Sequence, residues 1–150
     1  MIAFDTNILV YVEDRADHQR RRQHAFALMQ KLTAGIHCIP LQVFAEFLNA
    51  CAKKKFLPMD KAADKIAAYA AVFETPGTTA DDLQRAARIQ SRFNLQFFDA
   101  VIVSVSARAG ATLLLSEDMH DGLIVEGVRI VNPFNPANDG VIASVLNQAR

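Results

Sequence analysis

The stretch that decides the fold runs from residue 97 to residue 115 and reads FFDAVIVSVSARAGATLLL. Residues 97–109 are apolar nearly all round a helix, except for Asp99 near the start, which predicts a helix in the interior of the fold. Gly110 is placed to end that helix. Residues 112–115 predict a buried strand. A buried helix that leads into a buried strand is typical of an α/β domain with a mostly parallel sheet covered on both faces.

The rest of the chain repeats this alternation. Apolar runs predict strands at 2–4, 37–39 and 128–131, and helical periodicity predicts helices at 19–32, 41–54, 59–73 and 80–92, the last with Thr79 as its N-cap. Right-handed crossovers would join the parallel strands. The chain contains no internal repeat or linker, so we expect residues 1–150 to form one domain.

Composition and charge narrow the possible functions. The chain has 150 residues, of which 51% are hydrophobic, enough to bury roughly 70% of the surface of the unfolded chain. Sixteen basic and sixteen acidic residues cancel, so any contact with nucleic acid must be local. Cys38 and Cys51 lie in apolar stretches and are expected to be buried, reduced thiols in a cytoplasmic protein. No apolar run approaches the roughly 20 residues of a membrane span.

Acidic residues mark the carboxyl ends of the predicted strands, where open parallel sheets bind ligands. Asp5 follows the first strand, Asp118 follows the strand at 112–115, and Asp99 opens the buried helix. A buried carboxylate is costly unless a cation or hydrogen-bond donors compensate its charge. Each aspartate could instead serve only as a helix cap or turn residue. Glu46 belongs to a polar stripe that could be an ordinary solvated helix face.

Carboxylates that converge on one cleft repel one another, and Mg²⁺ or Mn²⁺ relieves that repulsion. The chain has no nucleophile motif and no glycine-rich phosphate loop, which favours metal-assisted hydrolysis of a phosphodiester. Two alternatives remain open. One is an acidic-site phosphatase of the haloacid-dehalogenase kind, although Asn7 stands where its second acid would be. The other is a non-catalytic module that binds RNA or protein.

Four motifs in this order carry a family resemblance: DTN at 5–7, VFAEFLN at 43–49, FFDAVIVSVSARAG at 97–110, and LLSEDMHDG at 114–122 followed by VRIVNPF at 128–134. Together they resemble a PIN-domain ribonuclease, specifically a VapC-type toxin of a toxin–antitoxin pair. The resemblance runs from Met1 to about Phe134. It implies a three-layer α/β fold with a roughly five-stranded parallel sheet flanked by helices.

The resemblance also implies a site. Its acidic quartet corresponds to Asp5, Glu46, Asp99 and Asp118, which would bind Mg²⁺ or Mn²⁺ so that an activated water attacks RNA phosphodiesters. Supporting roles fall to Thr6, Ser116 and Asp121; Ser116 is expected to hold Asp118 through its hydroxyl, and Asp121 is either a supporting acid or a turn former.

The resemblance further implies partners: a homodimer, and an antitoxin protein that inserts a segment into the acidic cleft. Residues 20–22 and 53–55 are two basic runs that either contact RNA phosphates or are solvated helix ends. His120 follows the acidic loop and is expected at the surface, where it could also contact substrate.

Overall fold

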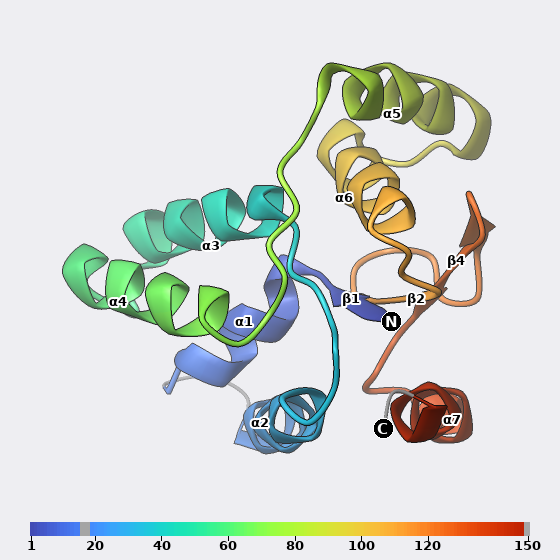
Figure 1. Cartoon of the computed structure of the whole chain (residues 1–150). Coiled ribbons are helices and arrows are strands. Elements are labelled where there is room, and N and C mark those ends of the chain that lie inside the picture. Colours follow the sequence, from blue (N-terminus) through green and yellow to red (C-terminus); the bar gives the residue numbers. More distant parts are fainter. Residues whose placement is uncertain (16–18, 149–150) are drawn as a thin grey trace.

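The computed structural model describes residues 1–15 and 19–148. These residues form a four-stranded sheet of β1 (Ile2–Phe4), β2 (Leu113–Leu115), β3 (Ile124–Val125) and β4 (Val128–Val131) in the order β1-β2-β4-β3. β1, β2 and β4 are parallel, and β3 pairs antiparallel with β4. Figure 1 shows the sheet near the middle of the molecule. The predicted α/β class with a mostly parallel sheet is confirmed.

The predicted strand at 37–39 is reduced to two isolated bridges, both at Cys38. Cys38 pairs in parallel with Ala3 on one side and with Glu74 on the other. Backbone hydrogen bonds continue the pattern, because the Cys38 amide donates to the Ile2 carbonyl at 3.0 Å and the Glu74 amide donates to the His37 carbonyl at 3.0 Å. The sheet therefore has four strands among the described residues, with these bridges on the outer side of β1.

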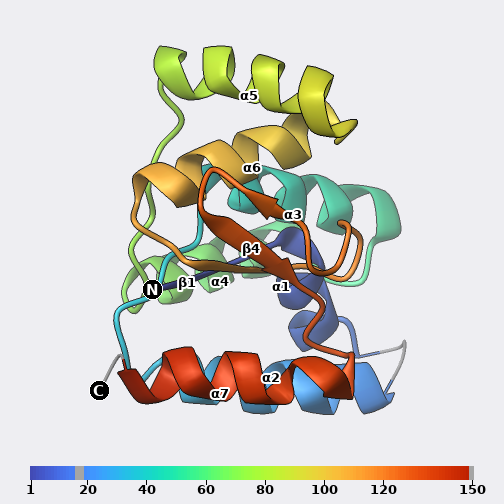
Figure 2. The ribbon, with the colours of Figure 1, turned by 90° about the vertical axis from the view of Figure 1, so that its right-hand side faces the viewer.

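Helices cover the sheet on both sides. They are α1 (Thr6–Glu13), α2 (Gln19–Leu32), α3 (Leu41–Lys54), α4 (Met59–Ala70), α5 (Ala80–Phe93), α6 (Phe97–Arg108) and α7 (Asp139–Gln148), with a 3₁₀ turn at Pro136–Asn138. In Figures 1 and 2, α5 and α6 lie on one side of the sheet and α2 and α7 on the other, while α3 and α4 lie beside α1. No helix of the described ranges is long and apolar enough to cross a membrane.

α6 is the interior helix that the sequence predicts. Its residues from Ala100 to Ser106 are all buried, so it packs against neighbours around its whole circumference. The residue in its N-cap position is Gln96, and no side chain caps the helix there. Asp99 lies in the first turn, so the alternative that Asp99 is the N-cap is wrong. Thr79 does cap α5 and forms a reciprocal capping box with Asp82.

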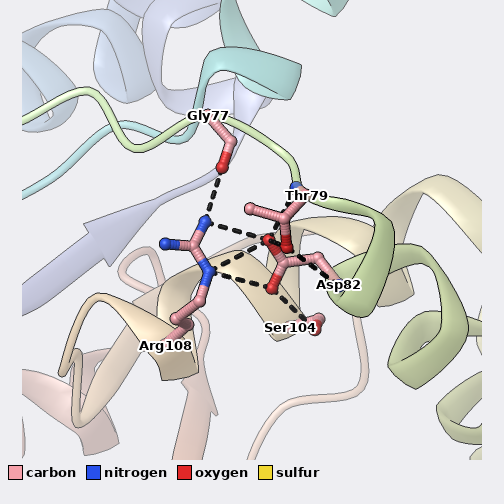
Figure 3. A network of polar contacts seen from close by, with 5 residues as sticks. All are labelled: Gly77, Thr79, Asp82, Ser104 and Arg108. Atoms are coloured by element: carbon pink, nitrogen blue, oxygen red, sulfur yellow. Dashed lines mark hydrogen bonds and ion pairs between the residues drawn. The ribbon is translucent and has the colours of Figure 1, made fainter.

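A buried ion pair joins the start of α5 to the end of α6 (Figure 3). Asp82 is fully buried, and Arg108 contacts it through Nε and through Nη2 at 2.9 Å. Arg108 also donates to the Gly77 carbonyl, and the Ser104 hydroxyl donates to Asp82 at 3.4 Å. Burial raises the pKa of Asp82, but hydrogen bonds from Arg108 and Thr79 outweigh it and lower the pKa to about 2. The pair therefore holds α6, and with it Asp99, against α5.

Candidate acidic active site

Asp5 is placed by the register of the parallel strands. The Asp5 amide donates to the Leu115 carbonyl at 2.9 Å, so the residues that follow β1 and β2 lie side by side. Its carboxylate accepts hydrogen bonds from the Thr6 amide at 2.7 Å and from the Ser116 hydroxyl at 2.7 Å. The side chain thus caps α1 while only 4% of the residue is exposed. The cap interpretation of Asp5 is confirmed, and the same residue lines the acidic cleft.

Glu46 on α3 faces the same place. The Thr6 hydroxyl donates to Glu46 Oε2 at 3.0 Å, and Gln42 Nε2 donates to Glu46 Oε1 at 3.0 Å. Thr6 therefore contacts two acids, Asp5 through its amide and Glu46 through its hydroxyl. Gln42 and Glu46 are half-buried, and the face of α3 that carries them forms one wall of the site.

Asn7 links Asp5 to the loop after β2. Its Nδ2 donates to Asp5 Oδ2 at 3.3 Å and to Asp118 Oδ2 at 3.3 Å, and its Oδ1 accepts from the Glu117 amide at 3.5 Å. A neutral amide thus lies between two carboxylates without cancelling their charge. Asn7 is a site residue that the acidic pattern alone does not identify, and its place in the DTN motif is the one signal for it in the sequence.

The loop from Ser116 to Gly122 is tied down at both ends. At its start, Glu117 forms an ion pair with Arg21 at 2.6 Å and accepts a hydrogen bond from Tyr11. At its end, Asp121 accepts hydrogen bonds from the Asn132 amide at 2.9 Å and from Asn138 Nδ2 at 3.0 Å. Asp118 lies between these anchors, at the mouth of the site.

One expectation about this loop is corrected. The Ser116 hydroxyl donates to Asp5 rather than to Asp118, because Ser116 continues β2 beside Asp5. Asp121 lies outside the lining of the acidic cleft and holds the segment after β4, and its supporting role stays a prediction.

Burial and neighbouring acids change the pKa values of Asp5 and Asp99. Burial raises the pKa of Asp5 to about 7, with Asp99 and Glu46 adding repulsion against the opposing effect of the Ser116 and Thr6 hydrogen bonds. Burial, Glu46 and Asp118 together raise the pKa of Asp99 to about 6. The neighbouring carboxylates thus disfavour the charged forms of Asp5 and Asp99.

The acids open into a cleft of about 660 Å³. Its lining includes all four members of the predicted quartet, together with Asn49, Lys53, Lys54 and Gln96. Of the two basic runs, residues 53 and 54 line this cleft and residues 20–22 do not. Arg21 instead pairs with Glu117, and Arg22 donates to the Val12 carbonyl at 3.3 Å.

The donor set suits a hard divalent cation. Carboxylate and amide oxygens are the ligands that Mg²⁺ and Mn²⁺ prefer. In the described part of the chain, no three Asp, Glu, His or Cys side chains stand close enough to hold one ion. Mg²⁺ keeps several of its waters and needs only one or two protein carboxylates. Burial and the neighbouring carboxylates raise the pKa of Asp5 and Asp99, so a bound cation would stabilise their charged forms.

An α/β protein whose parallel strands end in a carboxylate-lined cleft belongs to the class that binds ligands at the carboxyl edge of its sheet. The model of the PIN domain family matches residues 2–120. The chain belongs to the PIN domain family.

Solved structures of similar fold come from bacterial toxins. The Mycobacterium tuberculosis toxin VapC20, described as cleaving the sarcin-ricin loop, is 20% identical with a TM-score of 0.65, covering 79% of this chain and 92% of its own. A toxin–antitoxin complex from Klebsiella pneumoniae is 20% identical with a TM-score of 0.63, covering 89% and 98%. FitAcB from Neisseria gonorrhoeae is 14% identical with a TM-score of 0.64, covering 90% and 99%. No curated protein matches the sequence.

Proposed function

We propose that this protein is a Mg²⁺- or Mn²⁺-dependent endoribonuclease that acts as the toxin of a toxin–antitoxin pair. The observation that carries the proposal is the meeting of Asp5, Glu46, Asp99 and Asp118 in one cleft. These acids come from the residue after β1, from α3, from α6 and from the loop after β2, four places apart in the sequence. Membership of the PIN domain family supports the same reaction class.

The chain's own residues orient the acids. Both oxygens of Glu46 accept hydrogen bonds, from Thr6 and Gln42, and both oxygens of Asp5 do so from Thr6 and Ser116. A carboxylate held in this way keeps further lone pairs for a cation while losing its freedom to rotate. Thr6 and Ser116 are therefore positioning residues for Asp5 and Glu46.

Asp5 and Asp99 would hold the cation, with Glu46 and Asp118 binding it through water. A bound divalent cation supplies positive charge for the phosphate and activates water for attack on phosphorus. Lys53 and Lys54, exposed at one end of the cleft, would bind the neighbouring phosphates of the RNA backbone. This local basic patch would let a chain of zero net charge bind RNA.

The proposal includes partners. Solved complexes of similar fold contain an antitoxin, and we propose that a cognate antitoxin silences this protein by placing a basic side chain among the four acids. We further propose that residues 1–150 form one PIN domain, that the protein is a homodimer, and that it acts in the cytoplasm.

Conservative amide variants test the nuclease proposal. Purified Asp5→Asn, Glu46→Gln, Asp99→Asn and Asp118→Asn proteins are incubated with a pool of structured RNAs in Mn²⁺, with Asp64→Asn as the matched control. Asp64 is a surface acid on α4, with a side chain 75% exposed. Cleavage is expected to fall by roughly 10²-fold or more in the cleft variants and to persist in the control.

Equal cleavage by Asp5→Asn, Asp99→Asn and the parent protein would overturn the proposal. A folded parent protein that binds RNA but never cuts it in Mg²⁺ or Mn²⁺ would also overturn it, and would favour a non-catalytic binding module. A phosphoryl-aspartate trapped on Asp5 would instead favour the phosphatase alternative.

A further inference from the structure

A second hollow adjoins the acidic cleft. It measures about 690 Å³, and Gln96, Asp99 and Asp118 line both hollows. The two hollows therefore meet at the acids and form one trough. Their sizes fall within the roughly 300–1,000 Å³ typical of small-molecule sites, enough for a nucleotide on either side.

The two arms of the trough differ in chemistry. The arm on the α3 side is lined by Lys53, Lys54 and Asn49, whose side chains are polar and exposed. The other arm has an apolar floor, with Phe93, Leu95, Met119 and Leu123 all buried or half-buried, and a polar rim of Arg92, Asn94, Gln96 and His120. The first arm suits a sugar–phosphate backbone, and the second suits a flat apolar group with polar edges.

Phe93 and the Arg92 guanidinium above it form a layered stacking platform on the second arm, with the exposed guanidinium as its outer face. The Arg92 guanidinium lies over the Phe93 ring, 5.3 Å from its centre. Both residues end α5, and the positive φ of 55° at Asn94 turns the chain sharply there. Aromatic rings and arginine planes are the surfaces on which unpaired RNA bases stack.

We propose that the hollow lined by Arg92, Phe93 and His120 binds an unpaired nucleobase next to the phosphate held at the acidic cleft. The proposal rests on the nuclease function and adds to it a subsite for the base beside the cut. A base within a duplex has both faces covered by its neighbours and cannot reach a stacking surface. His120 and Asn94 supply hydrogen-bonding groups for the edge of the base.

Binding without cleavage tests this subsite directly. The probe is a fluorescent oligouridylate of about nine nucleotides, compared with an abasic ribose–phosphate chain of the same length and charge. Every protein carries Asp99→Asn and is kept in EDTA, so that neither chain is cut. The test variant is Phe93→Leu, and its matched control is Phe98→Leu, which makes the same change at an aromatic residue 58% exposed and outside both hollows.

Phe93→Leu is expected to raise the Kd for oligouridylate roughly tenfold, since base–aromatic stacking contributes that much to binding. It should leave the Kd for the abasic chain unchanged, and Phe98→Leu should change neither by more than about twofold. If Phe93→Leu raises the Kd for oligouridylate and the Kd for the abasic chain equally, or raises neither, the subsite is refuted.

Arg92→Ala provides a second variant that does not depend on packing, because Arg92 is exposed. It should raise the Kd for oligouridylate more than the Kd for the abasic chain. Arg88→Ala is its control, with the same charge change on an exposed residue one turn earlier in α5. Equal effects of the two alanine variants contradict the subsite.

Cleavage by the protein with Asp99 intact separates this inference from the proposed function. RNA cleavage in Mn²⁺ together with base-independent binding refutes the subsite alone. Base-dependent binding without cleavage under any divalent cation refutes the nuclease and leaves the subsite standing.

Discussion

Replacing Asp5 with asparagine is expected to stabilise the metal-free protein at about pH 8 while removing its activity. Asp5 is 4% exposed, and burial with repulsion from Asp99 and Glu46 raises its pKa from 3.8 to about 7. The folded state therefore keeps a proton that the unfolded state releases between these two values. The free energy of unfolding consequently decreases as the pH rises through this window.

The size of the effect follows from the shift. A difference of about 3 pKa units corresponds to about 4 kcal/mol of lost stability above pH 7, and to about 2 kcal/mol at about pH 5. Asparagine removes this cost but loses acceptors for the Ser116 hydroxyl and the Asn7 amide, which costs roughly 1–2 kcal/mol. The net gain is about 2–3 kcal/mol at about pH 8 and close to zero at about pH 5.

Urea unfolding followed by circular dichroism measures this difference in EDTA at both pH values, with Asp64→Asn as a control that should match the parent protein. Mn²⁺ should then stabilise the parent protein and have a much smaller effect on Asp5→Asn, because a ligand that binds only the folded state adds to its stability. An Asp5→Asn protein that is less stable than the parent at about pH 8, or equally shifted at both pH values, would refute the electrostatic account of this site.

Three further changes test other parts of the structure. Arg108→Met leaves the Asp82 carboxylate buried without its cationic partner and should lower the free energy of unfolding by about 3 kcal/mol. This value is in the lower part of the range for a broken buried pair, because the Arg108 side chain is 37% exposed. A melting temperature that moves by less than a degree would contradict this prediction. Thr6→Val removes the hydroxyl that donates to Glu46 and should reduce cleavage roughly 10- to 100-fold in a protein whose CD spectrum is unchanged, whereas full activity would show that this contact does not position Glu46. Ser116→Ala removes a hydrogen bond that lowers the pKa of Asp5, so the acid limb of the pH–rate profile should move to higher pH; a shift to lower pH would reverse the assigned sign.

The elements with strong apolar patterns could be predicted from the sequence. α6 is apolar on nearly every face, and Thr79 stands three residues before Asp82, a spacing typical of a capping box. β4 also begins and ends as expected. The segment predicted as a strand at 37–39 forms only isolated bridges at Cys38. Pro40 follows directly, and the chain turns there into α3.

Two elements did not follow from periodicity. β3 has only two residues and depends on the turn at Glu126 and Gly127, both with positive φ, which pairs Val125 with Val128. α7 buries only Ile142 along its length, so its pattern is weak. The predicted helix at 59–73 ends at Ala70, since the following residues must bring Glu74 to Cys38.

Some site residues could likewise be predicted from the sequence, and others could not. Asp5 and Asp99 are carboxylates in apolar surroundings, a conflict visible in the sequence itself. In the sequence, Glu46 belongs to a pattern typical of a solvated helix face. Its partner Thr6 lies 40 residues away, and only the folded chain brings the two together. Asn7 and the second arm of the trough depend on which loops meet after folding, and no local pattern encodes that meeting.

The most direct measurement is cleavage of structured RNA by the parent protein stripped with EDTA and then given back Mg²⁺ or Mn²⁺, beside a folded Asp99→Asn protein. The account predicts no cleavage in EDTA, cleavage that returns with the cation, and none from Asp99→Asn under either condition. Cleavage that persists in EDTA, or that Asp99→Asn performs as well as the parent protein, would contradict the claim that these acids are the catalytic centre.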